Sequence, residues 1–449
     1  MQDVRELRGR ACQSAPLDRR TVATQPVSAP PPTMGMGRHL GSPLEAMSDF
    51  CLVRQPVFGT NGALVGYEIR FRDLDDGQHA FVQSFLSGTF DLVRGNQPAF
   101  VACTRAQLLE NAFQVVDPAS AILLLPRDLE PEPDVINAIL AYREGGGSVA
   151  LDALSDVSAP SESLLTLAAW VRVTLRDDAE GTIRRLRERA ASYDGAMNIL
   201  VSQIESAAQF TLAKQLGARG FQGSFFSSPE PVAAADLPMG TMSAMRLMGL
   251  ARDPNVNDRK LEDVIATDPV LTFQLLRLVN SAAVGMRGVS SIGQALRLIG
   301  RNMFQRWLAV AVAASRKSTT GVDQELVRQA VERGRFLEQL GGGPRDPGTL
   351  FLVGLFSLLD AVFRMSLPEI LDRVVLSDEA NAALLDRTGP YADALSFVES
   401  YEMGMFENAG EIAKEMGLDP ARIGELYTNA VGWTNEALAP MVEGQLAGR

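Results

Sequence analysis

The sequence predicts an α/β barrel followed by an all-helical domain. Two extended, β-rich runs at 51–58 and 64–71 flank Asn61-Gly62, and Asn-Gly is the strongest short signal of a hairpin. Six short apolar runs then alternate with helix-like segments. Beyond a proline-containing stretch, almost every segment has helical spacing.

The six apolar runs have the length of buried strands. They are Ala99–Cys103, Ala121–Leu125, Ser148–Leu151, Trp170–Val173, Asn198–Val201 and Gly220–Gln222. The intervening segments 135–143, 183–191 and 207–216 mix polar and apolar residues as amphipathic crossover helices do. Strand, helix and strand at this spacing indicate parallel pairing with the helices outside. Together with the hairpin, the runs predict a shortened, TIM-like barrel.

Changes in composition mark the expected domain boundaries. Residues 1–48 contain crowded prolines and frequent Ser and Thr without periodicity, so we expect a disordered tail. Ser227–Val232 contains two prolines and closes a barrel domain at residues 49–232. Residues 238–449 are expected to form the helical domain.

Helix-start signals recur in the second half. Asp268, Ser291, Ser366 and Ser377 each precede a helical segment, as N-cap residues do. The apolar spacing within Leu271–Val279 predicts a buried helix face.

Composition excludes several classes of function. The net charge of −12 and the pI near 4.9 argue against a nucleic-acid-binding protein and against docking on an anionic membrane. No apolar run approaches the roughly 18 residues of a membrane span. Three scattered cysteines fit reduced thiols in a cytoplasmic protein. With only His39 and His79 in the chain, histidine-based metal sites and triads are nearly excluded.

Several motifs of the first half occur in a specific order. Arg54–Phe58 and Gly66–Arg72 open it, Ile204-Glu205 precedes its last helix, and Phe221–Pro229 closes it. In this order they resemble an EAL domain, the fold of cyclic-di-GMP phosphodiesterases. The resemblance covers residues 50 to about 232.

The second half is similar to another signalling domain. Leu261–Leu271, Leu275–Ser281, Val289–Gly300 and Phe351–Asp360 resemble an HDOD domain, and the EAL–HDOD pairing is a known bacterial signalling architecture. Metal-dependent HD phosphohydrolases, by comparison, need a His-Asp pair. Ser357-Leu358 stands at the corresponding position, which predicts no catalysis in this domain.

The EAL resemblance implies a site at the strand ends that holds two divalent cations through oxygen ligands. Glu68 matches the first glutamate of that site, Asp152 remains of an aspartate pair, and Gln222 is kept. The vestigial site comprises Gln55, Glu68, Arg72, Asp152, Arg172, Glu205 and Gln222.

The other positions that the resemblance implies have changed. Ala102 stands where a metal-binding asparagine is expected, Leu124 where a glutamate is expected, and Ala153 at the second aspartate. Arg172 replaces a lysine, and Ser202 replaces a later glutamate. Apolar side chains offer no lone pairs to Mg²⁺, so we expect no bound metal, no cofactor and no catalytic residue.

Two interpretations of the remaining polar residues stay open. In the structural one, Glu68 pairs with Arg72 or Arg172 and Asp152 pairs with Arg172, whose permanent charge replaces the cations. In the other, Gln55, Arg72 and Gln222 hydrogen-bond a cyclic dinucleotide without metal.

The sequence favours a non-catalytic, cytoplasmic regulatory protein that binds signalling proteins, not identified by the sequence, in a pathway related to cyclic-di-GMP. The first alternative is a cyclic-di-GMP receptor without hydrolysis, and the second is a residual phosphodiesterase.

The arginines between Arg277 and Arg306 are expected on solvated or ion-paired faces rather than on DNA. Met242, Met245 and Met248 are expected in a helical core rather than in a binding groove.

Overall fold

The computed structural model describes residues 50–73, 80–152, 162–175, 179–192, 197–227, 245, 247–251, 255–266, 272, 275, 276, 279, 289, 291–314, 320–343, 345–372, 374 and 376–446. The expected tail and the expected boundary between 232 and 238 lie outside these residues, so both stay predictions.

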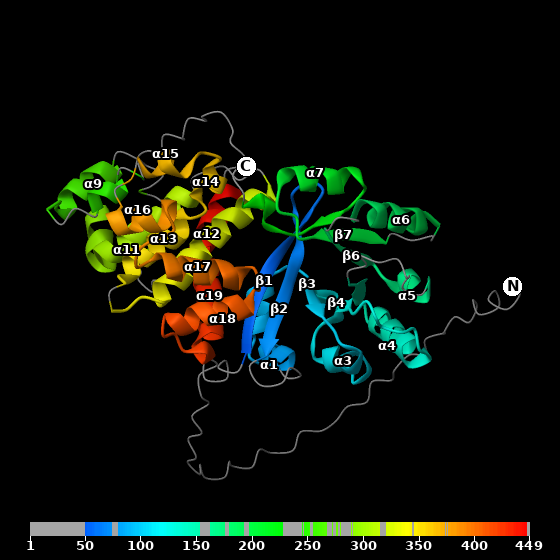
Figure 1. Ribbon diagram of the computed structural model, residues 1–449. Helices are drawn as coiled ribbons and strands as arrows, with labels where there is room; N and C mark the ends of the chain where they lie inside the picture. Colours follow the sequence, from blue (N-terminus) through cyan, green and yellow to red (C-terminus); the bar gives the residue numbers. More distant parts are fainter. Residues whose placement is uncertain are drawn as a thin grey trace, which may run out of the picture. The chain divides into compact units, whose positions relative to one another are not determined.

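Eight strands close into a barrel in chain order (Figure 1). They are β1 (Phe50–Gly59), β2 (Leu64–Asp73), β3 (Ala99–Ala102), β4 (Ala121–Leu125), β5 (Ser148–Leu151), β6 (Trp170–Thr174), β7 (Asn198–Ser202) and β8 (Gly220–Phe221). The pairs from β2 to β8 are parallel, whereas β1 is antiparallel to both β2 and β8. The predicted barrel is confirmed.

The hairpin turn explains why this segment pairs locally. The amide of Gly59 donates to the carbonyl of Ala63 at 2.8 Å, and the Ala63 amide donates to Asn61 Oδ1 at 3.1 Å. Gly62 has φ +73°, a left-handed conformation that glycine adopts without steric cost. The predicted Asn61-Gly62 turn is therefore confirmed.

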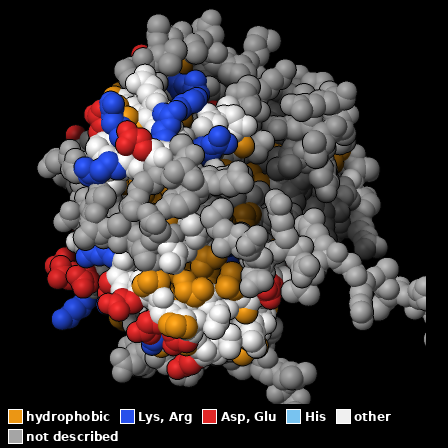
Figure 2. All heavy atoms as spheres, turned by 90° about the vertical axis from the view of Figure 1, so that its right-hand side faces the viewer, with side chains coloured by type: hydrophobic (Ala, Val, Ile, Leu, Met, Phe, Trp, Pro, Cys, Tyr) orange, Lys and Arg blue, Asp and Glu red, His pale blue; other side chains and the backbone are white. Residues whose placement is uncertain are grey.

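Helices connect the successive strands from β2 to β8, whereas the hairpin turn alone joins β1 to β2. They are α1 (Ala80–Leu86), α2 (Thr89–Arg94), α3 (Arg105–Leu109), α4 (Pro133–Glu144), α5 (Glu162–Leu167), α6 (Ala179–Ser192) and α7 (Ala207–Gln215). The face that carries α4 to α6 has a hydrophobic patch bordered by acidic side chains in its lower part and a group of basic side chains in its upper part (Figure 2).

The inside of the barrel is filled by side chains from alternate strand positions. Val57, Phe100, Ile122, Leu124, Ala150 and Leu200 form this buried cluster. Side chains alternate between the two faces of a strand, so residues two positions further along point to the same interior. Asp152 and Arg172 therefore face inward at the carboxyl ends of β5 and β6, which form the mouth of the barrel.

The second half of the chain is mostly helical. Its helices include α9 (Asp258–Ala266), α11 (Ile292–Ala314), α12 (Gly321–Gln339), α13 (Pro347–Phe356), α14 (Leu359–Phe363), α15 (Leu367–Leu371), α16 (Asp378–Leu385), α17 (Ala392–Glu402), α18 (Phe406–Glu415) and α19 (Pro420–Leu446). The long helix α12 packs against both α13 and α19. No helix in the described part of the chain combines the length and the apolar character of a membrane span.

Most of the expected helix caps within the described residues are present. Ser291 Oγ accepts from the Gln294 amide at 3.2 Å, and Ser377 Oγ accepts from the Ala380 amide at 3.3 Å. The predicted cap at Ser366 is wrong in one respect, because its side chain makes no capping hydrogen bond. Pro368 near the start of α15 lacks an N–H, so that helix has fewer donors to cap. Asp268 lies outside the described residues.

The expected helical core is present within the described residues. Leu275 and Val279 are buried, as are Met245 and Met248. Leu276 is half-buried and packs against the same core. Leu271 and Met242 lie outside the described residues.

The arginines at 301 and 306 make polar contacts within the fold. Arg301 forms an ion pair with Asp258 at 3.2 Å, and Arg306 with Glu338 at 2.5 Å. Both contacts agree with the expectation of ion-paired faces.

The barrel and the helical half contact each other directly along the hairpin. β1 packs against α12, α17 and α19. The hydroxyl of Tyr401 donates to the carbonyl of Leu52 at 2.8 Å, and the guanidinium of Arg72 donates to the carbonyl of Phe406 at 2.8 Å. The helices of the second half thus cover an outer surface of the barrel.

Candidate functional site

An arginine lies between two carboxylates at the mouth of the barrel. Arg172 Nη1 is 2.7 Å from Glu68 Oε1, and Arg172 Nε is 2.6 Å from Asp152 Oδ1. The side chains of Glu68 and Arg172 are 7% and 13% exposed, so water screens this pair little. Of the ion pairs that the sequence allowed, Glu68 with Arg172 and Asp152 with Arg172 are formed.

Two glutamines extend this arrangement towards the helical half. Gln222 Nε2 donates to Glu68 Oε2 and, at 3.1 Å, to Gln55 Oε1. Gln55 Nε2 in turn donates to the backbone carbonyl of Glu402 at 3.1 Å. Five of the seven predicted site residues therefore form one connected network.

The other two predicted site residues lie elsewhere. Arg72 reaches α18 instead of Glu68, because β2 continues beyond the mouth and carries this side chain to the helical half. The position near Glu68 belongs to Arg70, whose Nε is 3.2 Å from Glu68 Oε1. Glu205 is exposed in the turn after β7, and its amide donates to Gln209 Oε1 at 2.7 Å.

Sequence reasoning missed Arg70 and Glu402. Arg70 is two residues after Glu68 on the same strand, so strand alternation could have placed both side chains on one face. Glu402 is far away in the sequence, and no local pattern links it to Gln55.

The charge balance at the mouth favours an ionised Glu68. Burial alone would raise the pKa of its carboxyl, but the charges of Arg172 and Arg70 and the hydrogen bond from Gln222 together lower that pKa below its usual value. Burial likewise opposes the charge of Arg172, and Glu68 and Asp152 outweigh it and raise its pKa. Glu68 and Arg172 therefore stabilise each other as ions.

This balance predicts a specific pH dependence of stability. Glu68 binds protons more weakly in the folded chain than in the unfolded chain, so its contribution is present above the unfolded pKa, about 4.3, and is lost as pH falls through the lower folded pKa. We expect the unfolding free energy, measured by urea unfolding at a series of pH values, to fall less steeply with decreasing pH in Glu68→Gln than in the wild type. Glu411→Gln, at an exposed position of α18, is the control and should retain the wild-type slope. Equal slopes for Glu68→Gln and the wild type would contradict the ionised state.

In the helical half, a polar cluster centred on Arg333 includes Ser357, which stands where HD phosphohydrolases have their His-Asp pair. Arg333 Nη1 donates to Ser357 Oγ at 2.9 Å, and Arg333 Nη2 is 2.6 Å from Glu402 Oε2. Burial opposes the charge of Arg333, but Glu402 and other acidic groups outweigh it and raise its pKa. In the barrel, an arginine thus lies against two carboxylates where the EAL resemblance implies metal ligands, and in the helical half an arginine pairs with Glu402 beside the serine that stands where HD phosphohydrolases have their His-Asp pair.

The residues at the barrel mouth do not fit a pair of divalent cations. Ala102 and Leu124 provide no oxygen donors there, and the guanidinium of Arg172 lies against both remaining carboxylates. Within the described ranges, no group of three His, Cys, Asp or Glu side chains is arranged to hold a metal ion. Hard divalent cations need about six oxygen ligands, and a permanent positive charge at contact distance opposes their binding.

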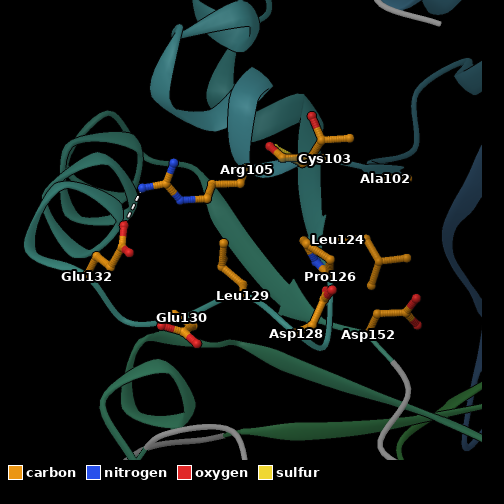
Figure 3. Close-up of a pocket in the computed structure, with 11 residues that line it drawn as sticks. Ala102, Cys103, Arg105, Leu124, Pro126, Asp128, Leu129, Glu130, Glu132 and Asp152 are labelled. Carbon is orange, nitrogen blue, oxygen red and sulfur yellow. Dashed lines mark hydrogen bonds and ion pairs between the residues drawn. The ribbon is translucent and has the colours of Figure 1, made fainter.

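A cavity of about 480 Å³ opens beside this network (Figure 3). It is lined by Ala102, Cys103, Thr104, Arg105, Leu124, Pro126, Asp128, Leu129, Glu130, Glu132 and Asp152. Ala102 ends β3, Leu124 is the next-to-last residue of β4 and Asp152 directly follows β5, so the cavity lies at the carboxyl ends of these strands. This is the usual place for a site in a barrel of this kind.

Comparison with known proteins supports the two-part organisation. Residues 237–384 match the family model of the HDOD domain. The uncharacterised protein YuxH of Bacillus subtilis is 25% identical over 406 residues, covering 86% of this chain and 98% of YuxH. The cyclic di-GMP phosphodiesterase CdgJ of Vibrio cholerae is 24% identical over 404 residues, covering 86% of this chain and 92% of CdgJ.

A solved structure, the EAL enzyme Bd1971 in its form bound to cAMP and cyclic-di-GMP, is similar with a TM-score of 0.33 and 14% identity. That match covers 41% of this chain and 63% of the Bd1971 chain, which is less than two thirds. The expected resemblance to an EAL–HDOD protein agrees with these matches: residues 237–384 match the HDOD family model, the whole chain is similar to CdgJ, and a closed eight-stranded barrel precedes the matched residues.

Proposed function

We propose that this chain is a regulatory protein of a cyclic-di-GMP-related pathway that binds other proteins and does not hydrolyse the dinucleotide. The observation that carries the proposal is the position of Arg172, in contact with both Glu68 and Asp152. A guanidinium there supplies the positive charge that divalent cations would otherwise supply, and it cannot activate water as a bound cation does. The whole-chain similarity to CdgJ supports the pathway.

Two further observations support a binding role. The helical half places Arg333 and Ser357 together where an HD enzyme would need its His-Asp pair. A hydrophobic patch bordered by acidic side chains is exposed on the face that carries α4 to α6 (Figure 2), and such patches commonly mark protein-interaction surfaces. We place this activity in the cytoplasm, where the buried free thiols of Cys51 and Cys103 would stay reduced.

The absence of hydrolysis is directly testable. The purified full chain, incubated with cyclic-di-GMP and Mg²⁺ or Mn²⁺, should release no linear dinucleotide above a protein-free blank when the products are separated by chromatography. CdgJ serves as the positive control, and Glu68→Ala as the matched variant. Turnover by the wild type that Glu68→Ala abolishes would contradict the proposal and favour a residual phosphodiesterase.

Measuring the binding of cyclic-di-GMP distinguishes the proposed protein-binding role from that of a cyclic-di-GMP receptor. Calorimetric titration of the full chain with cyclic-di-GMP should give no binding heat, because Gln55 and Gln222 already use side-chain hydrogen bonds within the fold. Saturable heat at high micromolar dinucleotide would favour the receptor alternative.

A protein partner should co-purify specifically from native lysate, and repeated recovery of none would count against a protein-binding role.

A further inference from the structure

The cavity beside the ion-paired network has an apolar floor. Leu124 and Leu129 are buried, and Pro126 is half-buried. Ala102, the last residue of β3, is exposed after three buried positions in that strand. The small side chain of Ala102 therefore leaves open space above an apolar surface at the end of a strand.

The rim of the cavity carries an excess of negative charge. Asp128, Glu130, Glu132 and Asp152 contribute carboxylates (Figure 3). Among the described lining residues, Arg105 is the cation, and it forms ion pairs with Glu132 and, at 3.1 Å, with Asp134 outside the cavity. Arg172 pairs with Asp152 from outside the lining, so the excess of negative charge comes from Asp128 and Glu130. An anionic dinucleotide would be repelled here, whereas a cationic group would be attracted.

We infer that this cavity binds a lysine or arginine side chain from a basic segment of a partner protein. Such a side chain has an apolar stem that can cover Ala102 and Leu124 and a charged end that can reach the rim carboxylates. A cavity of about 480 Å³ is large enough for one such residue and its neighbours. The inference rests on the proposed protein-binding function and specifies where on the barrel the partner docks.

A labelled peptide can test this site with the full chain. The probe is a fluorescein-labelled hexapeptide of alternating leucine and arginine, and its counterpart has glutamate in place of arginine. Fluorescence anisotropy should show saturable binding of the arginine peptide and none of the glutamate peptide. The double variant Asp128→Lys/Glu130→Lys should weaken binding at least about tenfold, because it reverses two rim charges.

Two further variants separate the cavity from general attraction to an acidic protein. Glu411→Lys/Glu415→Lys changes the net charge by the same amount at exposed positions of α18 and should leave the affinity within about twofold of wild type. Ala102→Phe fills the cavity without a change in charge and should weaken binding as well. Equal weakening by both double variants, no effect of Ala102→Phe, or no binding by the wild type would overturn the inference.

Partner recovery by the cavity variants and by the wild-type chain distinguishes an error in the docking site from an error in the proposed protein-binding function. Ala102→Phe and the rim variant should lose a protein partner that the wild-type chain recovers from lysate. Recovery of the same partner by both variants would overturn the docking site and leave the protein-binding function standing. Recovery of no partner by the wild type, together with hydrolysis of cyclic-di-GMP, would instead refute the proposed function.

Discussion

Replacing Arg54 with methionine is expected to lower the unfolding free energy of the full chain by about 3–5 kcal/mol. The side chain of Arg54 is 4% exposed and pairs with Glu332 of α12, which is 9% exposed. Arg54 Nη1 also donates to the carbonyl of Val93 at 2.7 Å, and its guanidinium lies 4.8 Å from the centre of the Tyr67 ring. Removing the arginine leaves a buried carboxylate without its counter-ion, and urea unfolding measures the cost.

Two controls assign this loss to the buried pair. Arg54→Met combined with Glu332→Leu should recover most of it, since no buried charge then remains unpaired. Arg184→Met removes an exposed pair with Glu180 and should cost less than about 1 kcal/mol. A loss that is as large in the double variant as in Arg54→Met would show that packing of the arginine stem, rather than charge pairing, dominates.

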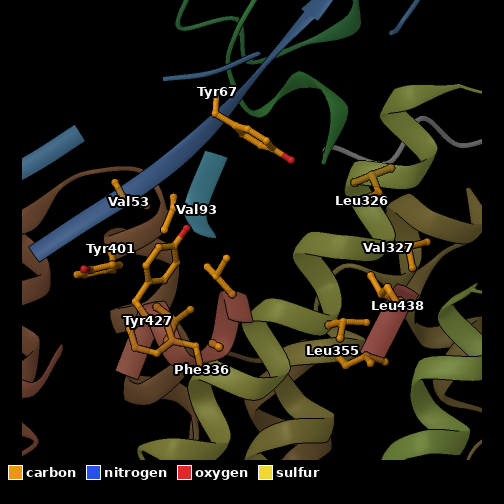
Figure 4. Close-up of a cluster of buried hydrophobic side chains, with 14 of the residues drawn as sticks. Val53, Tyr67, Val93, Leu326, Val327, Phe336, Leu355, Tyr401, Tyr427 and Leu438 are labelled. Atoms are coloured by element: carbon orange, nitrogen blue, oxygen red, sulfur yellow. The ribbon is translucent and has the colours of Figure 1, made fainter. Parts of the chain in front are cut away.

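The ion pair of Arg54 with Glu332 connects the barrel to the helical half, so each part contributes to the stability of the other. Arg54 is on β1, and its amide also donates to the hydroxyl of Tyr427 at 3.3 Å. Tyr427, Tyr401 and Phe336 pack as an aromatic cluster against the hairpin (Figure 4), with ring centres 5.3 to 5.6 Å apart. The helices α12, α17 and α19 thus bury the outer face of β1, and cooperative unfolding of both parts is expected.

The barrel was predictable because its signals are local. Short apolar runs between amphipathic segments fix strands and crossover helices, and Asn61-Gly62 fixes the hairpin. The inward direction of Asp152 and Arg172 follows from strand alternation alone. These features depend only on neighbouring residues, so one sequence is enough to find them.

The contacts that complete the site depend on tertiary geometry and could not be predicted. Glu332 pairs with Arg54 from 278 positions away, and nothing in the pattern of α12 indicates which of its acidic residues is buried. The choice between Arg70 and Arg72 as the partner of Glu68 depends on how far β2 extends beyond the mouth. The cavity likewise results from side chains contributed by three strand ends and the loops after them.

Replacing Arg172 with methionine is expected to lower the unfolding free energy by about 3 kcal/mol. The substitution keeps most of the side-chain volume but removes the charge that lies against Glu68 and Asp152. The side chain of Glu68 is 7% exposed, so water cannot replace the lost partner, and Arg70 and Gln222 remain its neighbours. Urea unfolding at pH 7 measures the loss, and Arg172→Lys, which keeps the charge without the two-sided geometry of a guanidinium, should recover part of it.

Arg70→Met is the matched control, because Arg70 contacts the same carboxylate from a side chain that is 38% exposed. Solvent screens that pair, so its removal should cost less than about 1 kcal/mol. The comparison isolates burial as the cause, since both arginines contact the same carboxylate oxygen of Glu68. Equal losses at the two positions would mean that Arg172 contributes no more than a surface ion pair, and the argument that it replaces the missing cations would then fail.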